Sequence, residues 1–221
     1  VLNKVKSKIN AKYDAELATL ENEQSSQKPQ ESNDVEGKKA DIERKIQGKD
    51  NKIENVTYNK DGKFEGTFLD NYELISEGSE STVYRSKDGS HVIKISEPYN
   101  SKDEDLFNSR IKNTILREII GNSGLEVIGY YEHNGVKNPI YRQNFIDGKT
   151  LSEKEVADYL KTIKGIVEID GKFYYKYDNK LYAISDFSDN VIQDKNGNIV
   201  PIDLDIYEVK NKEINAKYDA E

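Results

Sequence analysis

The sequence predicts an α+β fold in which antiparallel strands and two helices form two layers. Three observations indicate it. Segments rich in β-branched and aromatic residues recur through the middle of the chain, turn dipeptides such as Asp-Gly and Asn-Gly separate them, and two helix-like segments interrupt the series. Strands joined by such short turns run antiparallel.

The composition of the 221-residue chain indicates one folded domain accompanied by polar, extended material. Hydrophobic residues make up 35% of the chain and charged residues 33%. The formal net charge of -8 repels phosphate backbones, so nucleic acid is not an expected partner. The chain has no cysteine and no apolar run of membrane-spanning length. We therefore expect a cytoplasmic protein that does not contact a membrane.

Three zones follow one another along the chain. Residues 1–56 are predicted to be a charged helical spacer with a flexible linker, residues 57–209 hold nearly all the aromatic residues, and residues 210–221 begin a second spacer. The segment INAKYDAE occurs at 9–16 and again at 214–221, which favours a duplication. Because the chain begins with Val and contains no Met, we expect it to be a piece of a larger, multi-domain protein.

The central zone divides into elements in a regular order. The expected strands lie, in chain order, within 72–75, 82–85, 91–96, 125–147, 166–185 and 190–206. A first helix is expected over 105–122, with Gly121 near its end. A second is expected over 151–165, where Ser152 and Glu155 have the spacing of a capping box.

The segment SEGSESTV, residues 76–83, is consistent with two structures. It is either an ordinary hairpin turn or a loop that covers phosphate groups, because Gly78 and small neighbours such as Ser81 let the backbone approach an anion closely. Lys94 lies on the next predicted strand among apolar residues. A lysine on a buried strand needs an anionic partner, and the alternative is a solvated lysine.

The order of strand, small-residue loop, strand, turn, lysine-bearing strand, helix and hairpin resembles the N-terminal lobe of protein kinases. The resemblance implies that Lys94 contacts the nucleotide phosphates and that Glu118, on the facing helix, forms an ion pair with Lys94. Residues 144–147 resemble the hinge that binds adenine. The nucleotide-binding residues implied in this way are Gly78, Ser79, Ser81, Val83, Lys94 and Phe145.

The segment SDFSDNVIQDKNGNIVPIDLD, residues 185–205, resembles the catalytic and metal-binding segments of kinases and small-molecule phosphotransferases. Asn190 and Asp203 suit a hairpin that brings both to one Mg²⁺, with Asp205 as a further ligand. The alternative is a plain hairpin with an Asx turn. The family places its base Asp five residues before the Asn, whereas Asp186 stands four residues before it. Asp186 is the candidate base, and its displacement puts that role in question.

The resemblance therefore implies a minimal protein-kinase-like fold, with an antiparallel N-lobe sheet plus helix and a short, truncated C-lobe, flanked by charged helices. It is similar to the kinase-like domains within polyvalent proteins of bacteria, phages and mobile elements. The expected activity is ATP- and Mg²⁺-dependent phosphoryl transfer to an unidentified protein or small-molecule acceptor. Two alternatives stay open: a catalytically inactive binding module, and a structural protein whose functional part is a coiled coil.

Overall fold

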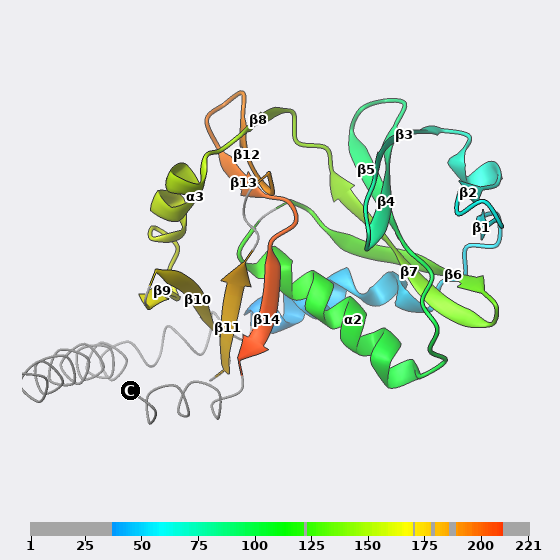
Figure 1. Ribbon diagram of the computed structural model, residues 1–221, viewed down its shortest axis with the longest axis horizontal. Helices are drawn as coiled ribbons and strands as arrows, with labels where there is room; N and C mark the ends of the chain where they lie inside the picture. The colour runs from blue at the N-terminus through cyan, green and yellow to red at the C-terminus, as the bar shows by residue number, and fades with distance from the viewer. Residues whose placement is uncertain (1–36, 122, 170, 178–179, 186–188, 210–221) are drawn as a thin grey trace, which may run out of the picture. The chain divides into compact units, whose positions relative to one another are not determined.

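The computed structural model describes residues 37–121, 123–169, 171–177, 180–185 and 189–209 (Figure 1). The chain divides into two compact units, Val1–Ala40 and Asp41–Glu221. Of the first unit, only residues 37–40 are described, and they are helical. The expected spacer helices before residue 37 and after residue 209 lie outside the described residues, as does Asp186, so these expectations stay predictions.

The largest sheet of the second unit has five antiparallel strands in the order β3-β4-β5-β7-β6. Their bounds are β3 Tyr72–Glu77, β4 Ser81–Ser86, β5 His91–Ser96, β6 Glu126–His133 and β7 Val136–Asn144. Asn134 and Gly135 have φ angles of 53° and 74°, as the two-residue turn between β6 and β7 requires. The strands and turns predicted for this part of the chain are confirmed.

The core of this sheet includes residues that precede it in the sequence. Its buried side chains are Val56, Phe64, Tyr84, Ile93, Ile95, Tyr131 and Ile140. Short elements lead into the sheet: η1 Gln47–Asp50, β1 Thr57–Tyr58, β2 Phe64–Glu65 and η2 Thr67–Leu69. Val56 is only 3% exposed, so residues that the sequence analysis assigns to the spacer contribute to the folded unit. The second unit accordingly begins at Asp41, ahead of the expected domain start.

Helix α2, Glu104–Leu116, follows the sheet's central strand β5 and is capped by Asp103. The Asp103 side chain accepts hydrogen bonds from two free backbone N–H groups of the first turn, which stabilises the helix start. The residues that the helix buries are Phe107, Ile111, Ile115 and Leu116. The first three recur every four residues, which is the apolar stripe expected of a helix that packs on a sheet.

The end of this helix differs from the sequence prediction. The α-helix stops at Leu116 and continues as one turn of 3₁₀-helix, η3 Arg117–Ile119, instead of running on to residue 122. A 3₁₀ turn has three residues per turn rather than 3.6, so side chains after Leu116 point in different directions from those of a continued α-helix. Gly121 follows closely, and a β-carbon there would lie 2.6 Å from the carbonyl oxygen of Pro201.

The second half of the folded unit consists of two smaller antiparallel sheets and one helix. The strands are β8 Gly148–Thr150, β9 Ile166–Ile169, β10 Lys172–Tyr177, β11 Lys180–Ser185, β12 Val191–Asp194, β13 Ile199–Pro201 and β14 Asp205–Val209. They pair in the orders β14-β11-β10-β9 and β13-β12-β8. Helix α3, Glu153–Leu160, starts with the predicted capping box of Ser152 and Glu155.

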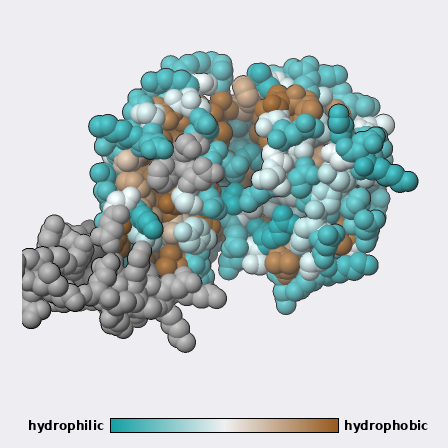
Figure 2. Space-filling view, in the orientation of Figure 1, coloured by the Kyte–Doolittle hydropathy of each residue, from teal (hydrophilic) through white to brown (hydrophobic). Residues whose placement is uncertain are grey.

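The surface of the described residues is largely hydrophilic on the face that Figure 2 presents. Hydrophilic residues also gather in the hollow near the middle of this view, between patches of hydrophobic residues. Across the described ranges, no helix combines the length and the apolar character that crossing a membrane would need.

Candidate active site

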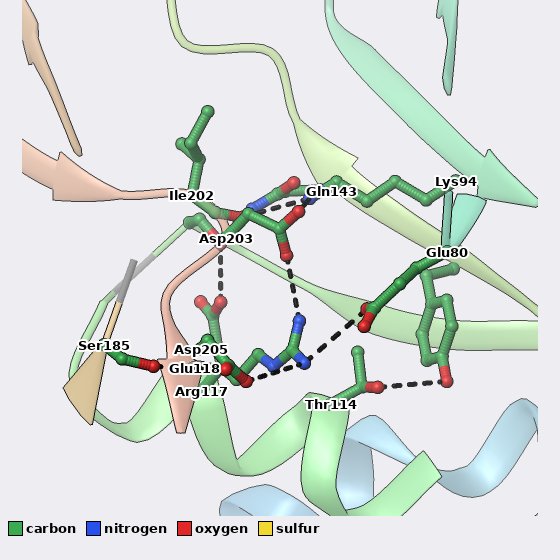
Figure 3. A network of polar contacts seen from close by, with 12 residues as sticks. Glu80, Lys94, Thr114, Arg117, Glu118, Gln143, Ser185, Ile202, Asp203 and Asp205 are labelled. Atoms are coloured by element: carbon green, nitrogen blue, oxygen red, sulfur yellow. Dashed lines mark hydrogen bonds and ion pairs between the residues drawn. The ribbon is translucent and has the colours of Figure 1, made fainter. Parts of the chain in front are cut away.

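Lys94 lies on strand β5, between β4 and β7, and its side chain is 12% exposed. Its Nζ donates a hydrogen bond to the carbonyl oxygen of Ile202 at 3.1 Å and lies 3.6 Å from Oδ2 of Asp203 (Figure 3). Burial lowers the pKa of Lys94, and the Asp203 carboxylate acts against that decrease. The buried lysine thus has the anionic partner that the sequence predicts it to need.

Asp203 and Asp205 both approach the guanidinium of Arg117. Asp203 Oδ1 is 3.1 Å from Nη1 of Arg117, and Asp205 Oδ1 is 3.6 Å from Nη2. Ser185, at the end of β11, donates a hydrogen bond to Asp205 Oδ2 at 3.1 Å. Glu80, from the loop between β3 and β4, lies 3.8 Å from the same guanidinium. Arg117 therefore joins the loop, the end of helix α2 and the two predicted metal ligands (Figure 3).

Glu118 has partners other than the one that the resemblance implies. Its Oε2 accepts a hydrogen bond from Ser123 Oγ at 2.5 Å, and its Oε1 accepts one from the backbone N–H of Gly124 at 2.7 Å. Lys45 Nζ lies 3.5 Å from Oε1. Within the described part of the chain, no ion pair joins Lys94 to Glu118. Glu118 lies in the 3₁₀ turn that follows α2, where side-chain directions differ from those of a continued α-helix.

A chain of hydrogen bonds nevertheless connects Glu118 to the surroundings of Lys94. Gln143 Nε2 donates to Ser123 Oγ at 2.6 Å and to the carbonyl oxygen of Ile202 at 2.8 Å. Ile202 is also the residue whose carbonyl oxygen accepts from Lys94. Gln143 is 2% exposed, so these contacts hold the segment before Asp203 in a dry environment, where such bonds are strong.

The predicted metal ligands come from one hairpin. Strands β12 and β13 pair, and the N–H of Ile202 donates to the carbonyl oxygen of Asn190 at 2.8 Å, which holds the two ends of the hairpin together. Asp203 and Asp205 already share one cationic group, Arg117, and carboxylate and amide oxygens are ligands that Mg²⁺ prefers. No cluster of three or more His, Cys, Asp or Glu side chains with the geometry of a metal site occurs among the residues that the structure describes.

A cavity of about 350 Å³ opens beside Lys94. It is lined by residues of the β3–β4 loop, strand β5, residues 97–99, helix α2 and the segment at Asp203. Ser79 and Ser81 of the predicted phosphate loop face this cavity, and Val83 pairs with Lys94 across strands β4 and β5. The loop, the lysine and Asp203 thus all line one cavity.

Three predicted nucleotide-binding residues, Gly78, Val83 and Phe145, are not among the residues that line the cavity. The Arg85 guanidinium lies 3.8 Å from the centre of the Phe145 ring, which is outside the cavity lining. The backbone N–H of Phe145 donates to the carbonyl oxygen of Ser90. Gly78 closes the turn before β4, where its N–H donates to the carbonyl oxygen of Ser81 at 3.0 Å.

Sequence reasoning missed several residues that complete the site. Arg117, Ser123 and Gln143 hold its acidic groups and the Ile202 carbonyl, and Arg110 lines the cavity. The spacing of polar residues at 110, 113, 114 and 117, which repeats every three or four residues beside the apolar stripe, could have indicated a second inward face of the helix.

Comparison with known proteins identifies one matching protein family. A family model described as a serine/threonine/tyrosine kinase found in polyvalent proteins matches residues 47–210, more than half of the chain. No curated protein and no solved structure matches the chain. The matched range begins at residue 47, so it includes part of the segment before residue 57 that packs into the folded unit.

Proposed function

Because this chain belongs to the family of serine/threonine/tyrosine kinases found in polyvalent proteins, we propose that it is an ATP- and Mg²⁺-dependent phosphotransferase module. In this proposal it acts within a larger protein, and its acceptor is a protein side chain or a small molecule. The antiparallel sheets and few helices of the folded unit are compatible with a kinase-like fold. In the proposal, the five-stranded sheet and α2 correspond to an N-lobe, and β8–β14 with α3 to a short C-lobe.

The observation that carries the proposal is the meeting of Lys94 with Asp203. The two residues are far apart in the sequence, yet Nζ and Oδ2 lie 3.6 Å apart at the edge of a cavity. Phosphoryl transfer depends mainly on positioning and on neutralising negative charge, and a buried lysine opposite a metal-binding carboxylate provides both. A salt bridge that served stability alone would not need to face a cavity.

Each residue of the proposed site has a distinct task. Lys94 binds the phosphate groups of the nucleotide, and the backbone of the loop that carries Gly78, Ser79 and Ser81 covers them. Asp203, Asp205 and Asn190 would hold Mg²⁺, which neutralises the charge on the terminal phosphates when bound. The candidate base, Asp186, would accept the proton of the acceptor hydroxyl group.

Glu118 has an indirect task in this proposal. It positions the Ile202–Asp203 segment through Ser123 and Gln143, instead of pairing with Lys94. Phe145 would contact adenine only through a change in its stacking on Arg85.

A catalytically inactive binding module is the second candidate function. The pairing of Arg117 with both Asp203 and Asp205 favours it, because a guanidinium there competes with a metal ion. A module that binds nucleotide without transferring phosphate would tolerate this competition better than an enzyme that needs the metal at each turnover.

Titration calorimetry of ATP into the full chain, with and without Mg²⁺, tests the proposal. We expect Mg²⁺-dependent binding that is lost in Lys94→Ala and in Asp203→Ala. Absence of binding at about 1 mM ATP would overturn the proposal, since kinases bind nucleotide more tightly than this. Binding without turnover toward protein and small-molecule acceptors would support the inactive module.

A further inference from the structure

We propose that the cavity contains a second anion-binding subsite, formed by Arg110 and Arg117 with Asn113 and Thr114 between them, which binds a phosphate-type oxyanion. The inference deepens the proposed function, on which its role in phosphoryl transfer rests. The oxyanion is either a phosphate group carried by the acceptor or the terminal phosphate of the nucleotide. The binding of the anion itself can be tested independently of any activity.

Arg110, Asn113 and Thr114 lie on helix α2, and Arg117 begins the 3₁₀ turn that follows it. Positions 110, 113, 114 and 117 are separated by three, one and three residues, a spacing that places side chains on the same side of a helix, and all four line the cavity. The apolar stripe of Phe107, Ile111 and Ile115 lies beside this face and is buried. Helix α2 therefore buries one stripe in the core and presents a polar, doubly cationic stripe to the cavity.

Arg110 carries a charge that the described residues do not compensate. None of the carboxylates in the described residues lies within ion-pair distance of its guanidinium, whose central carbon lies 4.0 Å from the centre of the Tyr99 ring. Its Nη1 is buried and lacks a hydrogen-bond partner among the described residues. A guanidinium held flat against an aromatic ring keeps its edge available for an oxyanion, which it binds through paired N–H donors.

Other donors at the same end of the cavity also lack partners. Tyr99 Oη and Arg117 Nε are buried without a hydrogen-bond partner in the described part of the chain. Tyr141, also in the lining, donates to Thr114 Oγ1, and burial raises the pKa of Tyr141 to about 12, so it is a neutral hydroxyl at physiological pH. Unsatisfied donors on residues that line one cavity favour a ligand rich in acceptors.

The charges around the cavity are not evenly arranged. Its lining contains three cations, Lys94, Arg110 and Arg117, and three carboxylates, Glu80, Glu97 and Asp203. Asp203 contacts Lys94 and Arg117, and Glu97 accepts a hydrogen bond from Thr82. Arg110 is thus the cation at which an added anion meets least competition. Removing the charge of Asp203 would also release Arg117 toward the anion.

The test is titration of inorganic phosphate into the full chain, followed by calorimetry or by chemical shifts. We expect saturable binding that weakens by at least about tenfold in Arg110→Gln, because a hydrogen-bonded charge pair is lost. Arg110→Lys should restore part of the affinity. The matched control is Arg142→Gln: Arg142 is half exposed, pairs with Glu126 and lies outside the cavity lining, so phosphate affinity should not change.

The Asp203→Asn variant distinguishes phosphate binding at this subsite from binding at the proposed metal and nucleotide site. We expect phosphate affinity to rise in this variant, because a repelling carboxylate is gone and Arg117 is released, whereas Mg²⁺-dependent nucleotide binding falls. Phosphate that binds together with Mg²⁺-ADP and with Mg²⁺-ATP would identify an acceptor group. Phosphate that Mg²⁺-ATP alone displaces would identify the terminal phosphate of the nucleotide.

Two results would overturn the inference. One is the absence of phosphate binding by the wild-type chain up to about 10 mM, the weak limit for a built anion site. The other is equal phosphate affinity in the wild type and in both Arg110 variants, each shown to be folded by circular dichroism. Either result would leave the proposed nucleotide site standing, because that site is tested through Lys94 and Asp203.

Discussion

Glu118 and Asp203 are two acidic residues linked through the same hydrogen-bonded segment, and their surroundings differ sharply. The Glu118 side chain is 4% exposed, and its two oxygens accept hydrogen bonds from Ser123 and Gly124 beside a nearby lysine. The Asp203 side chain is 44% exposed, lies at a cavity and contacts Lys94 and Arg117. The first carboxylate is fully occupied by the protein, whereas the second can exchange its partners.

The difference separates a residue that supports the fold, Glu118, from a residue of the proposed site, Asp203. Replacing a partner of Glu118 leaves a buried charge without compensation, so substitutions around Glu118 should destabilise the fold strongly. Replacing a partner of Asp203 exposes the carboxylate to water or to another cation at little cost. Gln143 donates hydrogen bonds to Ser123, the partner of Glu118, and to the carbonyl oxygen of Ile202, which precedes Asp203. The surroundings of Glu118 therefore help to position Asp203.

The largest effect is expected from Glu118→Ala. Loss of a buried, hydrogen-bonded carboxylate leaves Lys45 and the Ser123 hydroxyl without their acceptor, and the free energy of unfolding should fall by about 3 kcal/mol. Urea denaturation measures this. Asp203→Ala is the matched comparison and should lose less, because Asp203 is 44% exposed and water can reach the space that it leaves beside Lys94. Equal losses in the two variants would contradict the distinction between Glu118 and Asp203.

Gln143→Leu should have the next largest effect. The substitution removes the donor that serves both Ser123 and the Ile202 carbonyl, and the free energy of unfolding should fall by about 2 kcal/mol. Mg²⁺-dependent nucleotide affinity should also fall, because the Asp203 segment loses a support. Gln193→Leu, on an exposed hydrogen bond of the β12–β13 hairpin, provides the control. Nucleotide affinity that stays unchanged in Gln143→Leu would show that Asp203 does not depend on this support.

Arg117→Gln should increase the affinity for a divalent cation in the absence of nucleotide. Removal of the guanidinium that contacts Asp203 and Asp205 takes away a competing charge, and we expect about a fivefold gain in Mn²⁺ affinity. Electron paramagnetic resonance of free Mn²⁺ measures it. Arg142→Gln should leave the affinity unchanged. A weaker Mn²⁺ affinity in Arg117→Gln would show that Arg117 organises the two carboxylates instead of blocking them.

The smallest expected effect is a change of stability with pH at Lys94. Burial lowers the pKa of Lys94 in the folded chain below its unfolded value near 10.5, so the unfolded chain binds more protons between these two values. The Lys94 charge therefore destabilises the fold at neutral pH, and this penalty disappears as pH rises. In urea denaturation, wild type should gain stability relative to Lys94→Met as pH rises toward the unfolded value. A constant difference as pH rises would contradict the lowered pKa.

Local rules predicted most of the fold. Asn-Gly and Asp-Gly dipeptides located the turns, and the spacing of Ser152 and Glu155 located the start of helix α3. The buried strand around Lys94 correctly indicated a need for an anionic partner, and Asp203 fulfils it. These features depend on short stretches of sequence, whose turn and cap geometry is largely independent of the rest of the chain.

The partners of Glu118 could not be predicted in the same way. The winding changes after Leu116, just before Glu118, and Gly121 packs closely against Pro201 shortly after it. Neither feature follows from the local sequence pattern. The same limit applies to Val56, whose burial depends on a sheet formed by residues further along the chain. The role of Asp186 stays a prediction, because that residue lies outside the described residues.

The most direct test of the distinction between Asp203 and Glu118 is titration of nucleotide, with and without Mg²⁺, into Asp203→Asn and Glu118→Gln. Both variants should first be shown to be folded at the working temperature. The account predicts that Asp203→Asn loses the Mg²⁺-dependent part of the affinity and that Glu118→Gln retains it. Loss of that part in Glu118→Gln, with retention in Asp203→Asn, would contradict the assignment of Asp203 to the site and of Glu118 to its support.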